Sequence, residues 1–158
     1  MINIKPLKAY TDNYIWLLET NEEVSVVDPG DAKPVLDYLS KTNKNIRDIF
    51  ITHHHFDHTA GVPELENIIS GSIYGPKNSY ELINEKVTQG DTLSSLGIKF
   101  EIIEVPGHTL DHIAFYNEEN DILFCGDTLF AGGCGRVFEG TFDQMFESLN
   151  LSLIHISE

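Results

Sequence analysis

The chain has 158 residues, a hydrophobic fraction of 41% and a formal net charge of −15, from 10 basic and 25 acidic residues. This length allows one domain with a substantial hydrophobic core. The excess of acidic residues argues against binding to nucleic acid or to an anionic membrane through a general basic surface. No stretch is apolar for long enough to span a bilayer.

The number of cysteines and the first five residues indicate the cellular compartment in which the protein is expected. Only Cys125 and Cys134 occur, too few for a small secreted disulfide scaffold. Residues 1–5 lack the basic segment followed by an apolar one that marks a signal peptide. We therefore expect a cytoplasmic protein with reduced thiols, and a monomer.

The first half of the chain predicts strands that alternate with turns, followed by a strand, helix, strand unit. Apolar and β-branched runs indicate the strands, and the helix is indicated by Val35, Leu36 and Leu39 at helical spacing. Such a unit implies two parallel strands joined by a crossover. The expected elements are strands at 2–9, 14–18, 23–27 and 46–51 and a helix at 32–41.

In the second half strands again dominate, and Thr141 is the expected N-cap of a last helix that places Phe142, Met145, Phe146 and Leu149 on one face. This composition favours two sheets packed face to face with helices outside, an α/β (α+β) fold. The expected elements are a short helix at 62–69 with Leu65, Ile68 and Ile69 inward, a strand at 72–74, one or two helical turns at 78–83, strands at 98–105, 112–116 and 122–125, a glycine-rich loop at 131–136 and a helix at 141–149.

The strand expected at 46–51 leads directly into a cluster of potential metal ligands, His53, His55, Asp57 and His58. His53 and His55 are two residues apart, so both rings can point to one side while His54 points to the other. Two histidines with an Asp-His pair beside them suggest two neighbouring metal positions. A histidine run can also be a tag or a low-complexity tract, but this run is internal and follows a buried strand.

Two further polar residues follow apolar strands and sit beside a glycine, namely His108 after Gly107 and Asp127 after Gly126. Taken alone, each is more often a turn or capping residue. With the first cluster present, His108 is a suitable third nitrogen ligand beside His53 and His55. Asp127 has two oxygens and could bridge two cations. Histidine and carboxylate ligands suit Zn²⁺ well and also accept Mn²⁺ or Fe²⁺.

Other polar residues near these motifs have more than one interpretation. His112 lies in an expected strand, so we interpret it as structural or as a support for a ligand. Asp28 and Asp31 end another strand and either form a turn or support the metal ligands. Cys125 is expected to be an inert core thiol, and Cys134 has no evident activating partner.

These motifs resemble a known family. Residues 52–58 (THHHFDH) are similar to the T-H-x-H-x-D-H signature of the metallo-β-lactamase superfamily, and residues 105–109 and 124–128 resemble its next two metal motifs in the same order. Residues 126–141 are similar to those of the glyoxalase II (hydroxyacylglutathione hydrolase) family, as are residues 12–16. The resemblance covers about residues 1–150.

The resemblance implies an αββα four-layer sandwich, incomplete at the C-terminus, with two divalent metal ions at one edge, zinc first and iron or manganese as alternatives. His53, His55 and His108 would hold one ion, Asp57 and His58 the other, and Asp127 would bridge them. Asp57 and Asp127 would be the catalytic carboxylates, with Asp57 orienting the attacking hydroxide. Arg136 and Phe138 fall where the family binds glutathione.

The chain departs from the family pattern at its C-terminus. The second metal of the family takes one more histidine in an H-E-Y-type segment, and His155 lacks that context. We therefore expect residues 1–150 to form a partial catalytic domain and residues 151–158 to be a non-family tail.

The implied reaction is hydrolysis of a glutathione thioester, S-D-lactoylglutathione, to D-lactate and glutathione. The alternatives are a persulfide dioxygenase-like enzyme with a single iron and an inactive metal-binding fragment.

Overall fold

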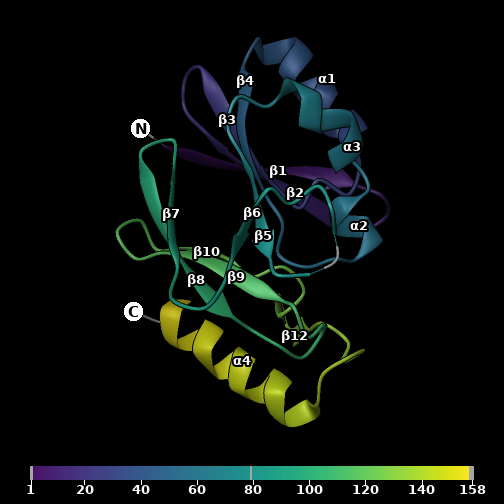
Figure 1. Cartoon of the computed structure of the whole chain (residues 1–158), viewed down its shortest axis with the longest axis vertical. Helices are drawn as coiled ribbons and strands as arrows, with labels where there is room; N and C mark the ends of the chain where they lie inside the picture. The colour runs from purple at the N-terminus through teal and green to yellow at the C-terminus, as the bar shows by residue number, and fades with distance from the viewer. Residues whose placement is uncertain (1, 79, 157–158) are drawn as a thin grey trace.

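The computed structural model describes residues 2–78 and 80–156, with side chains as far as Ser152. Most of its strands belong to two sheets (Figure 1). The elements are β1 (Asn3–Ala9), β2 (Asn13–Glu19), β3 (Glu23–Val27), α1 (Ala32–Thr42), β4 (Asn45–Phe50), α2 (Phe56–Thr59), α3 (Val62–Leu65), a 3-10 turn η1 (Glu66–Ile68), β5 (Ile73–Pro76), β6 (Glu85–Val87), β7 (Thr92–Ser95), β8 (Ile98–Glu104), β9 (Ile113–Asn117), β10 (Ile122–Phe124), β11 (Leu129–Phe130), β12 (Gly133–Cys134) and α4 (Phe142–Ile156).

The first sheet has six strands in the order β1-β2-β3-β4-β5-β6. The first three strands pair antiparallel, whereas β3 to β6 are parallel. Helix α1 joins the parallel neighbours β3 and β4, which confirms the predicted crossover. Because β4 lies inside this sheet, the segment that follows it starts from a rigid and buried position.

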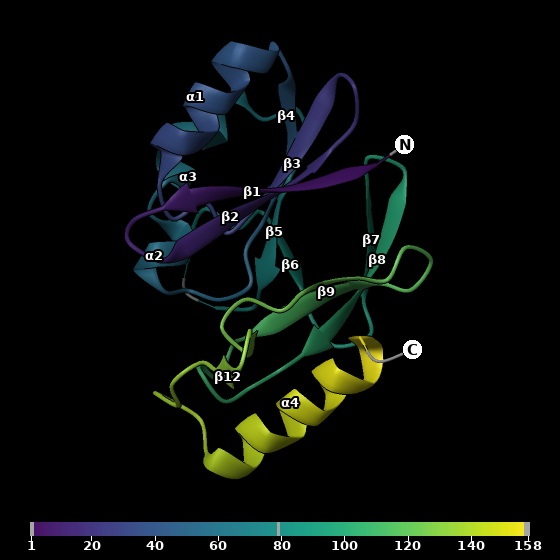
Figure 2. The ribbon, with the colours of Figure 1, turned by 180° about the vertical axis from the view of Figure 1, so that it is seen from behind.

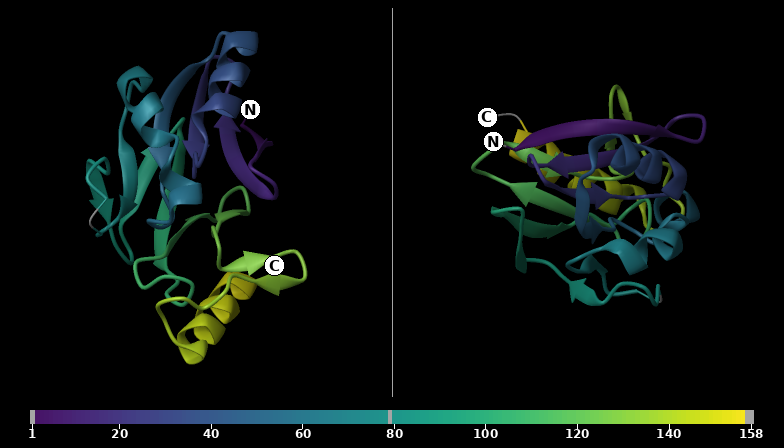
Figure 3. Two further views of the ribbon diagram at one scale, coloured as in Figure 1. Left: turned by 90° about the vertical axis from the view of Figure 1, so that its right-hand side faces the viewer. Right: turned by 90° about the horizontal axis from the view of Figure 1, so that it is seen from above.

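The second sheet is antiparallel, with four strands in the order β10-β9-β8-β7. The sheets face each other across a core in which the Phe50 ring stacks on Phe115 with centroids 4.9 Å apart and meets Phe100 edge to face. A second core lies between the first sheet and the helices α1 and α3, through residues such as Val35 and Leu65. Helices α1 and α4 lie on opposite sides of the strands (Figures 2 and 3), so the predicted sandwich is confirmed.

Helix α4 departs from its predicted packing. Thr141 is its N-cap as predicted, because its hydroxyl accepts from the Gln144 backbone N–H at 3.1 Å while the Gln144 side chain accepts from the Thr141 N–H. However, Phe142 and Phe146 are 83% and 65% exposed. Among the side chains of this helix that the structure describes, up to Ser152, the buried ones are Met145, Ser148 and Ser152. Met145 packs closely on Gly107, and the Ser148 hydroxyl donates to the carbonyl of Pro106, so contacts with residues 106 and 107 orient the helix.

Two smaller predictions were wrong. Ile68 was expected to point inward but is 48% exposed, because the helix tightens to a 3-10 turn after Leu65. The helical turns expected at residues 78–83 include residue 79, which lies outside the described part of the chain, and the described neighbours form only a turn at Glu81 and Leu82.

The predicted boundary at residue 150 falls within α4, which continues to Ile156, and the assignment of residues 151–158 to a separate tail stays a prediction. No helix in the described ranges combines the length and apolar character that crossing a bilayer requires.

Candidate metal centre

The predicted ligands meet where strands of both sheets end. The residues after β4 carry His53, His55, Asp57 and His58, the residues after β8 carry His108, and the turn after β10 carries Asp127. Gly126 makes this turn possible, because its φ is +48° and a Cβ there would lie 2.4 Å from the Thr52 hydroxyl. The two sheets thus bring together residues that are up to 74 positions apart, from 53 to 127.

Three of the predicted ligand histidines, His53, His58 and His108, have Nδ1 atoms that contact residues outside the predicted ligand set. The Nδ1 of His53 lies 3.0 Å from the Thr52 hydroxyl, which itself donates to Asp28, so His53 is the donor in this contact. His58 Nδ1 contacts the Asp28 carboxylate at 3.0 Å, and His108 Nδ1 contacts the Arg136 carbonyl at 2.7 Å. Each bond fixes the ring and leaves Nε2 as the nitrogen that faces the site.

These Nε2 atoms form a set suited to a cation. The Nε2 of His53 is buried and has no hydrogen-bond partner in the described structure. The Nε2 of His58 is also buried and faces the carboxylates of Asp127 and Asp57. The Nε2 of His108 lies 3.0 Å from Nδ1 of His55, and ligand atoms of His53, His55 and His108 lie within 4.8 Å of one another. Buried polar atoms without partners are rare and costly, so this arrangement fits a bound divalent metal.

Asp127 lies between the two groups of histidines, as a bridging ligand must. Its Oδ1 is 3.1 Å from His58 Nε2, and its Oδ2 is 3.3 Å from His108 Nε2. Burial lowers the pKa of His58, but the carboxylates of Asp28 and Asp127 outweigh burial and raise that pKa to about 10. The two carboxylates therefore favour a positive charge at this position, whether a proton or a metal ion carries it.

Asp57 lies at the open side of the cluster and is 46% exposed at its side chain. One of its oxygens accepts a hydrogen bond of 2.8 Å from the Asn13 amide, which comes from the start of β2. The same oxygen is 3.6 Å from His58 Nε2. Asp57 is thus held by one oxygen while the other is free of protein hydrogen bonds in the described structure.

The alternatives left open for three supporting residues can now be separated. Asp28 supports the ligands, because it accepts from the Thr52 backbone and hydroxyl and contacts His58. Asp31 is instead the N-cap of α1, where it accepts from the Lys33 N–H. His112 is fully buried, and its Nε2 accepts from the Asp127 backbone N–H at 3.0 Å, so it supports the Asp127 turn. Burial lowers the pKa of His112 to about 4, which keeps the ring neutral.

The loop that carries the two predicted substrate-binding residues lies beside the cluster. Phe138 is 59% exposed, and its ring centroid is 5.6 Å from that of His55. Arg136 is exposed, and its guanidinium carbon lies 5.2 Å from the centre of the Phe138 ring. Both side chains are available to a ligand that reaches the cluster, and their role in substrate binding stays a prediction.

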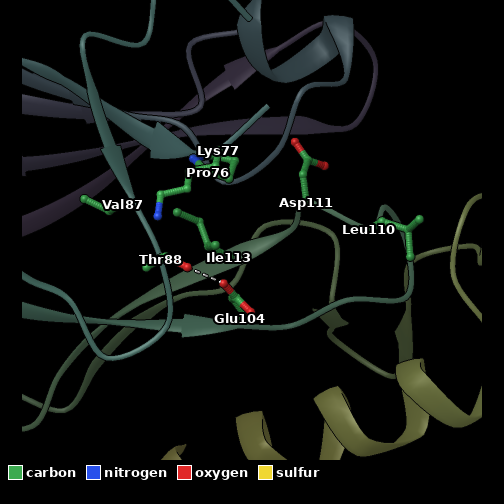
Figure 4. Close-up of a pocket in the computed structure, with 8 residues that line it drawn as sticks. All are labelled: Pro76, Lys77, Val87, Thr88, Glu104, Leu110, Asp111 and Ile113. Atoms are coloured by element: carbon green, nitrogen blue, oxygen red, sulfur yellow. Dashed lines mark hydrogen bonds between the residues drawn. The ribbon is translucent and has the colours of Figure 1, made fainter. Parts of the chain in front are cut away.

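Sequence reasoning missed the contributions of Asn13, Thr52 and Asp111. Asn13 contacts a residue 44 positions away, so no local pattern could reveal the contact. Asp111 contacts His54 and also lines a small pocket between the ends of β5, β6, β8 and β9 (Figure 4). None of the predicted metal ligands lines that pocket, which is lined by Pro76, Lys77, Val87, Thr88, Glu104, Leu110, Asp111 and Ile113.

Comparison with known families identifies the class of protein to which this fold and this histidine cluster belong. Residues 11–156 match the family described as the metallo-beta-lactamase superfamily, and the chain belongs to this superfamily. Membership of this superfamily, together with the grouped donors, implies a dinuclear metal site.

A more particular likeness is to curated hydrolases. The chain is 50% identical over 157 residues to a protein of Pseudoalteromonas translucida named hydroxyacylglutathione hydrolase, an alignment that covers 95% of this chain and 59% of that protein. A protein of the same name from Chromohalobacter salexigens is 50% identical over 153 residues, covering 94% of this chain and 60% of the relative. The chain thus spans about three fifths of the length of these relatives.

A solved structure with the same fold is that of the B3 metallo-beta-lactamase BLEG-1. Its TM-score is 0.84 with 21% identity, and the superposition covers 99% of this chain and 87% of that one. This likeness supports the fold alone.

Proposed function

We propose that this chain carries the catalytic site of a metal-dependent thioester hydrolase that acts on S-2-hydroxyacylglutathione, converting S-D-lactoylglutathione to D-lactate and glutathione. The observation that carries the proposal is the convergence of histidine Nε2 atoms on both oxygens of Asp127. The names of the relatives at 50% identity support the choice of substrate.

We further propose two divalent cations, zinc first. His53, His55 and His108 would hold one ion, Asp57 and His58 the other, and Asp127 would contact both. When bound, such ions supply an activated water and stabilise the negative charge that develops on a carbonyl oxygen. The nitrogen and carboxylate donors suit zinc, and they do not exclude iron or manganese.

The protein's own residues would orient the reactants. Asn13 fixes one oxygen of Asp57, so the other oxygen can accept a hydrogen bond from the attacking water and hold it in line. Asp28 and His112 keep His58 and Asp127 in place during the reaction. The thiolate of glutathione is a good leaving group at neutral pH, so a general acid is not essential.

Arg136 and Phe138 would bind the glutathione part of the substrate. A guanidinium pairs well with a carboxylate, and glutathione carries carboxylates at its ends. The Phe138 ring lies near both Arg136 and His55, so it can pack along the peptide backbone of the substrate as the thioester reaches the cluster. These contacts would contribute to binding, and the chemical step would stay with the cluster.

Turnover tests the proposal directly. The purified chain, loaded with zinc, should hydrolyse S-D-lactoylglutathione, followed by loss of the thioester absorbance and release of thiol. Removal of the metal with a chelator should stop the reaction, and zinc should restore it. A metal-loaded chain without turnover would contradict the proposal for this chain, and oxygen uptake with bound iron would instead favour the dioxygenase.

A further inference from the structure

His54, the middle histidine of the run, is not one of the proposed metal ligands. It contacts two carboxylates instead. Its Nδ1 forms a hydrogen bond of 2.9 Å with Asp111, and its Nε2 lies 3.2 Å from Glu139. Asp111 comes from the turn after His108, and Glu139 comes from the loop before α4. One side chain therefore connects three segments that surround the candidate metal centre.

Both carboxylates have partners of their own, so the contacts to His54 are fixed at each end. Asp111 is only 11% exposed at its side chain, and its second oxygen accepts from the Asn78 amide. The second oxygen of Glu139 accepts a hydrogen bond of 2.9 Å from the Leu110 backbone N–H. A polar contact whose partners are already ordered costs less side-chain entropy than an isolated surface pair.

The loop that Glu139 belongs to also carries Arg136 and Phe138, the residues proposed to bind glutathione. Its backbone is attached to the second metal motif, because the N–H groups of Phe138 and Glu139 donate to the His108 carbonyl at 3.2 and 3.4 Å. The His54 contact attaches the same loop to the first metal motif. Holding the loop from both sides would fix where Arg136 and Phe138 stand relative to the cluster.

We propose that His54 is a positioning residue that holds the loop of residues 136–139 against the metal cluster and thereby sets the affinity for glutathione. This proposal rests on the proposed function for the identity of the ligand. The contact between His54 and the loop is independent of it. The proposal assigns His54 to substrate binding and leaves metal binding and the chemical step to the neighbouring histidines.

The rate of trypsin cleavage after Arg136 measures how firmly the loop of residues 136–139 is held. This measurement does not require the chain to be enzymatically active. His54→Asn keeps an amide near the position of Nδ1 and loses the reach to Glu139, whereas His54→Gln places its amide near the position of Nε2. His54→Asn should raise the cleavage rate at Arg136 about three- to fivefold, and His54→Gln should stay near the wild-type rate. Cleavage after Lys41, which is exposed in α1, reports general destabilisation.

The matched control is Asp37→Ala, which breaks an exposed ion pair with Lys33 on α1. It should leave cleavage at Arg136 unchanged. Equal cleavage at Arg136 in His54→Asn and wild type would overturn the proposal. So would a parallel increase at Arg136 and Lys41, since the loop would then respond only to loss of overall stability.

The second measurement separates binding from chemistry. His54→Asn should raise KM for S-D-lactoylglutathione about three- to fivefold, with kcat and metal per chain unchanged. In a Glu139→Ala background the same substitution should add little, because the contact is already lost. An unchanged KM, or a loss confined to kcat, would overturn the role in binding. If the wild-type chain shows no turnover, the proposed function fails, and the cleavage rates still decide whether His54 holds the loop.

Discussion

Two buried polar clusters lie at different ends of the first sheet, and they are built differently. At one end, Glu19 accepts hydrogen bonds from Asn3 at 2.9 Å, from Lys44 at 2.7 Å and from the Tyr38 hydroxyl. At the other end, His53 and His58 each use Nδ1 for a hydrogen bond. The Nε2 of His53 is then buried without a hydrogen-bond partner in the described structure, and the Nε2 of His58 faces Asp127 at 3.1 Å.

This difference shows how a structural cluster can be told from a binding site. A polar group that serves only the fold is satisfied by the protein itself, because an unsatisfied buried group destabilises the folded state by about 1–3 kcal/mol. An unsatisfied buried nitrogen among grouped ligand atoms, as at His53, indicates that an absent ligand completes the set. The Glu19 cluster should therefore matter for stability alone, and the histidine cluster for metal and activity.

The largest effect is expected at Asp127, which contacts both groups of histidines. Asp127→Ala should weaken metal binding by more than about 100-fold and abolish hydrolysis, because the bridging oxygens are lost and His58 and His108 lose a shared partner. Metal analysis after dialysis and the hydrolysis rate check this. A variant that kept two ions per chain would show that Asp127 is not a ligand.

A smaller loss is expected at Asp28, whose carboxylate contacts Thr52 and the Nδ1 atom of His58. Asp28→Ala should weaken metal affinity about 10- to 100-fold, as is typical when a partner of a ligand is removed. Competition with a chromophoric chelator measures the affinity. Asp37→Ala on the surface of α1 is the matched control, and an equal effect in both variants would contradict the role given to Asp28.

Arg136 should affect substrate binding and leave the metal in place. Arg136→Ala should raise KM for S-D-lactoylglutathione about tenfold with kcat nearly unchanged, because an ionic contact to the substrate is lost. Steady-state kinetics at fixed metal content provide the measurement. If KM did not change, glutathione would not be bound at this loop.

The smallest effect is expected at Glu19. Burial raises the pKa of Glu19, but hydrogen bonds from Lys44, Tyr38 and Asn3 outweigh burial and lower it to about 2, from an ordinary value of 4.5. Since the folded-state pKa is depressed, this stabilisation is fully present above pH 4.5 and is lost as the pH falls towards 2.

Glu19→Gln should therefore lower the free energy of unfolding by about 1 kcal/mol at neutral pH and flatten its pH dependence between 4.5 and 2. Urea unfolding at several pH values measures both changes. Metal content should stay as in the wild type, and a loss of metal would contradict the separation of the two clusters.

Much of the fold and of the candidate site could be predicted because the relevant signals are local. The strand that precedes His53 ends in the apolar run Ile49-Phe50-Ile51. His108 and Asp127 each follow an apolar strand and a glycine. Residues at the ends of buried strands meet at one edge, so adjacency to a strand was enough to group them. Whether each residue binds a metal stays a prediction.

What could not be predicted depends on pairs that are far apart in the sequence. Asn13 meets Asp57, and His54 meets Asp111 and Glu139, across contacts that no periodicity records. A comparison of α1 with α4 also shows that local spacing does not predict contacts between distant residues. Val35 is buried in α1 as its spacing predicts, whereas α4 exposes Phe142 and Phe146, because its orientation is decided by contacts with residues 106 and 107.

Metal content per chain tests the central claim most directly. Wild-type protein and the Glu19→Gln variant should each be incubated with zinc, dialysed and analysed for bound metal and protein concentration. Both proteins should retain about two ions per chain, since the grouped ligand atoms belong to the histidine cluster and Glu19 is not among them. No retained metal in the wild-type chain would contradict this claim.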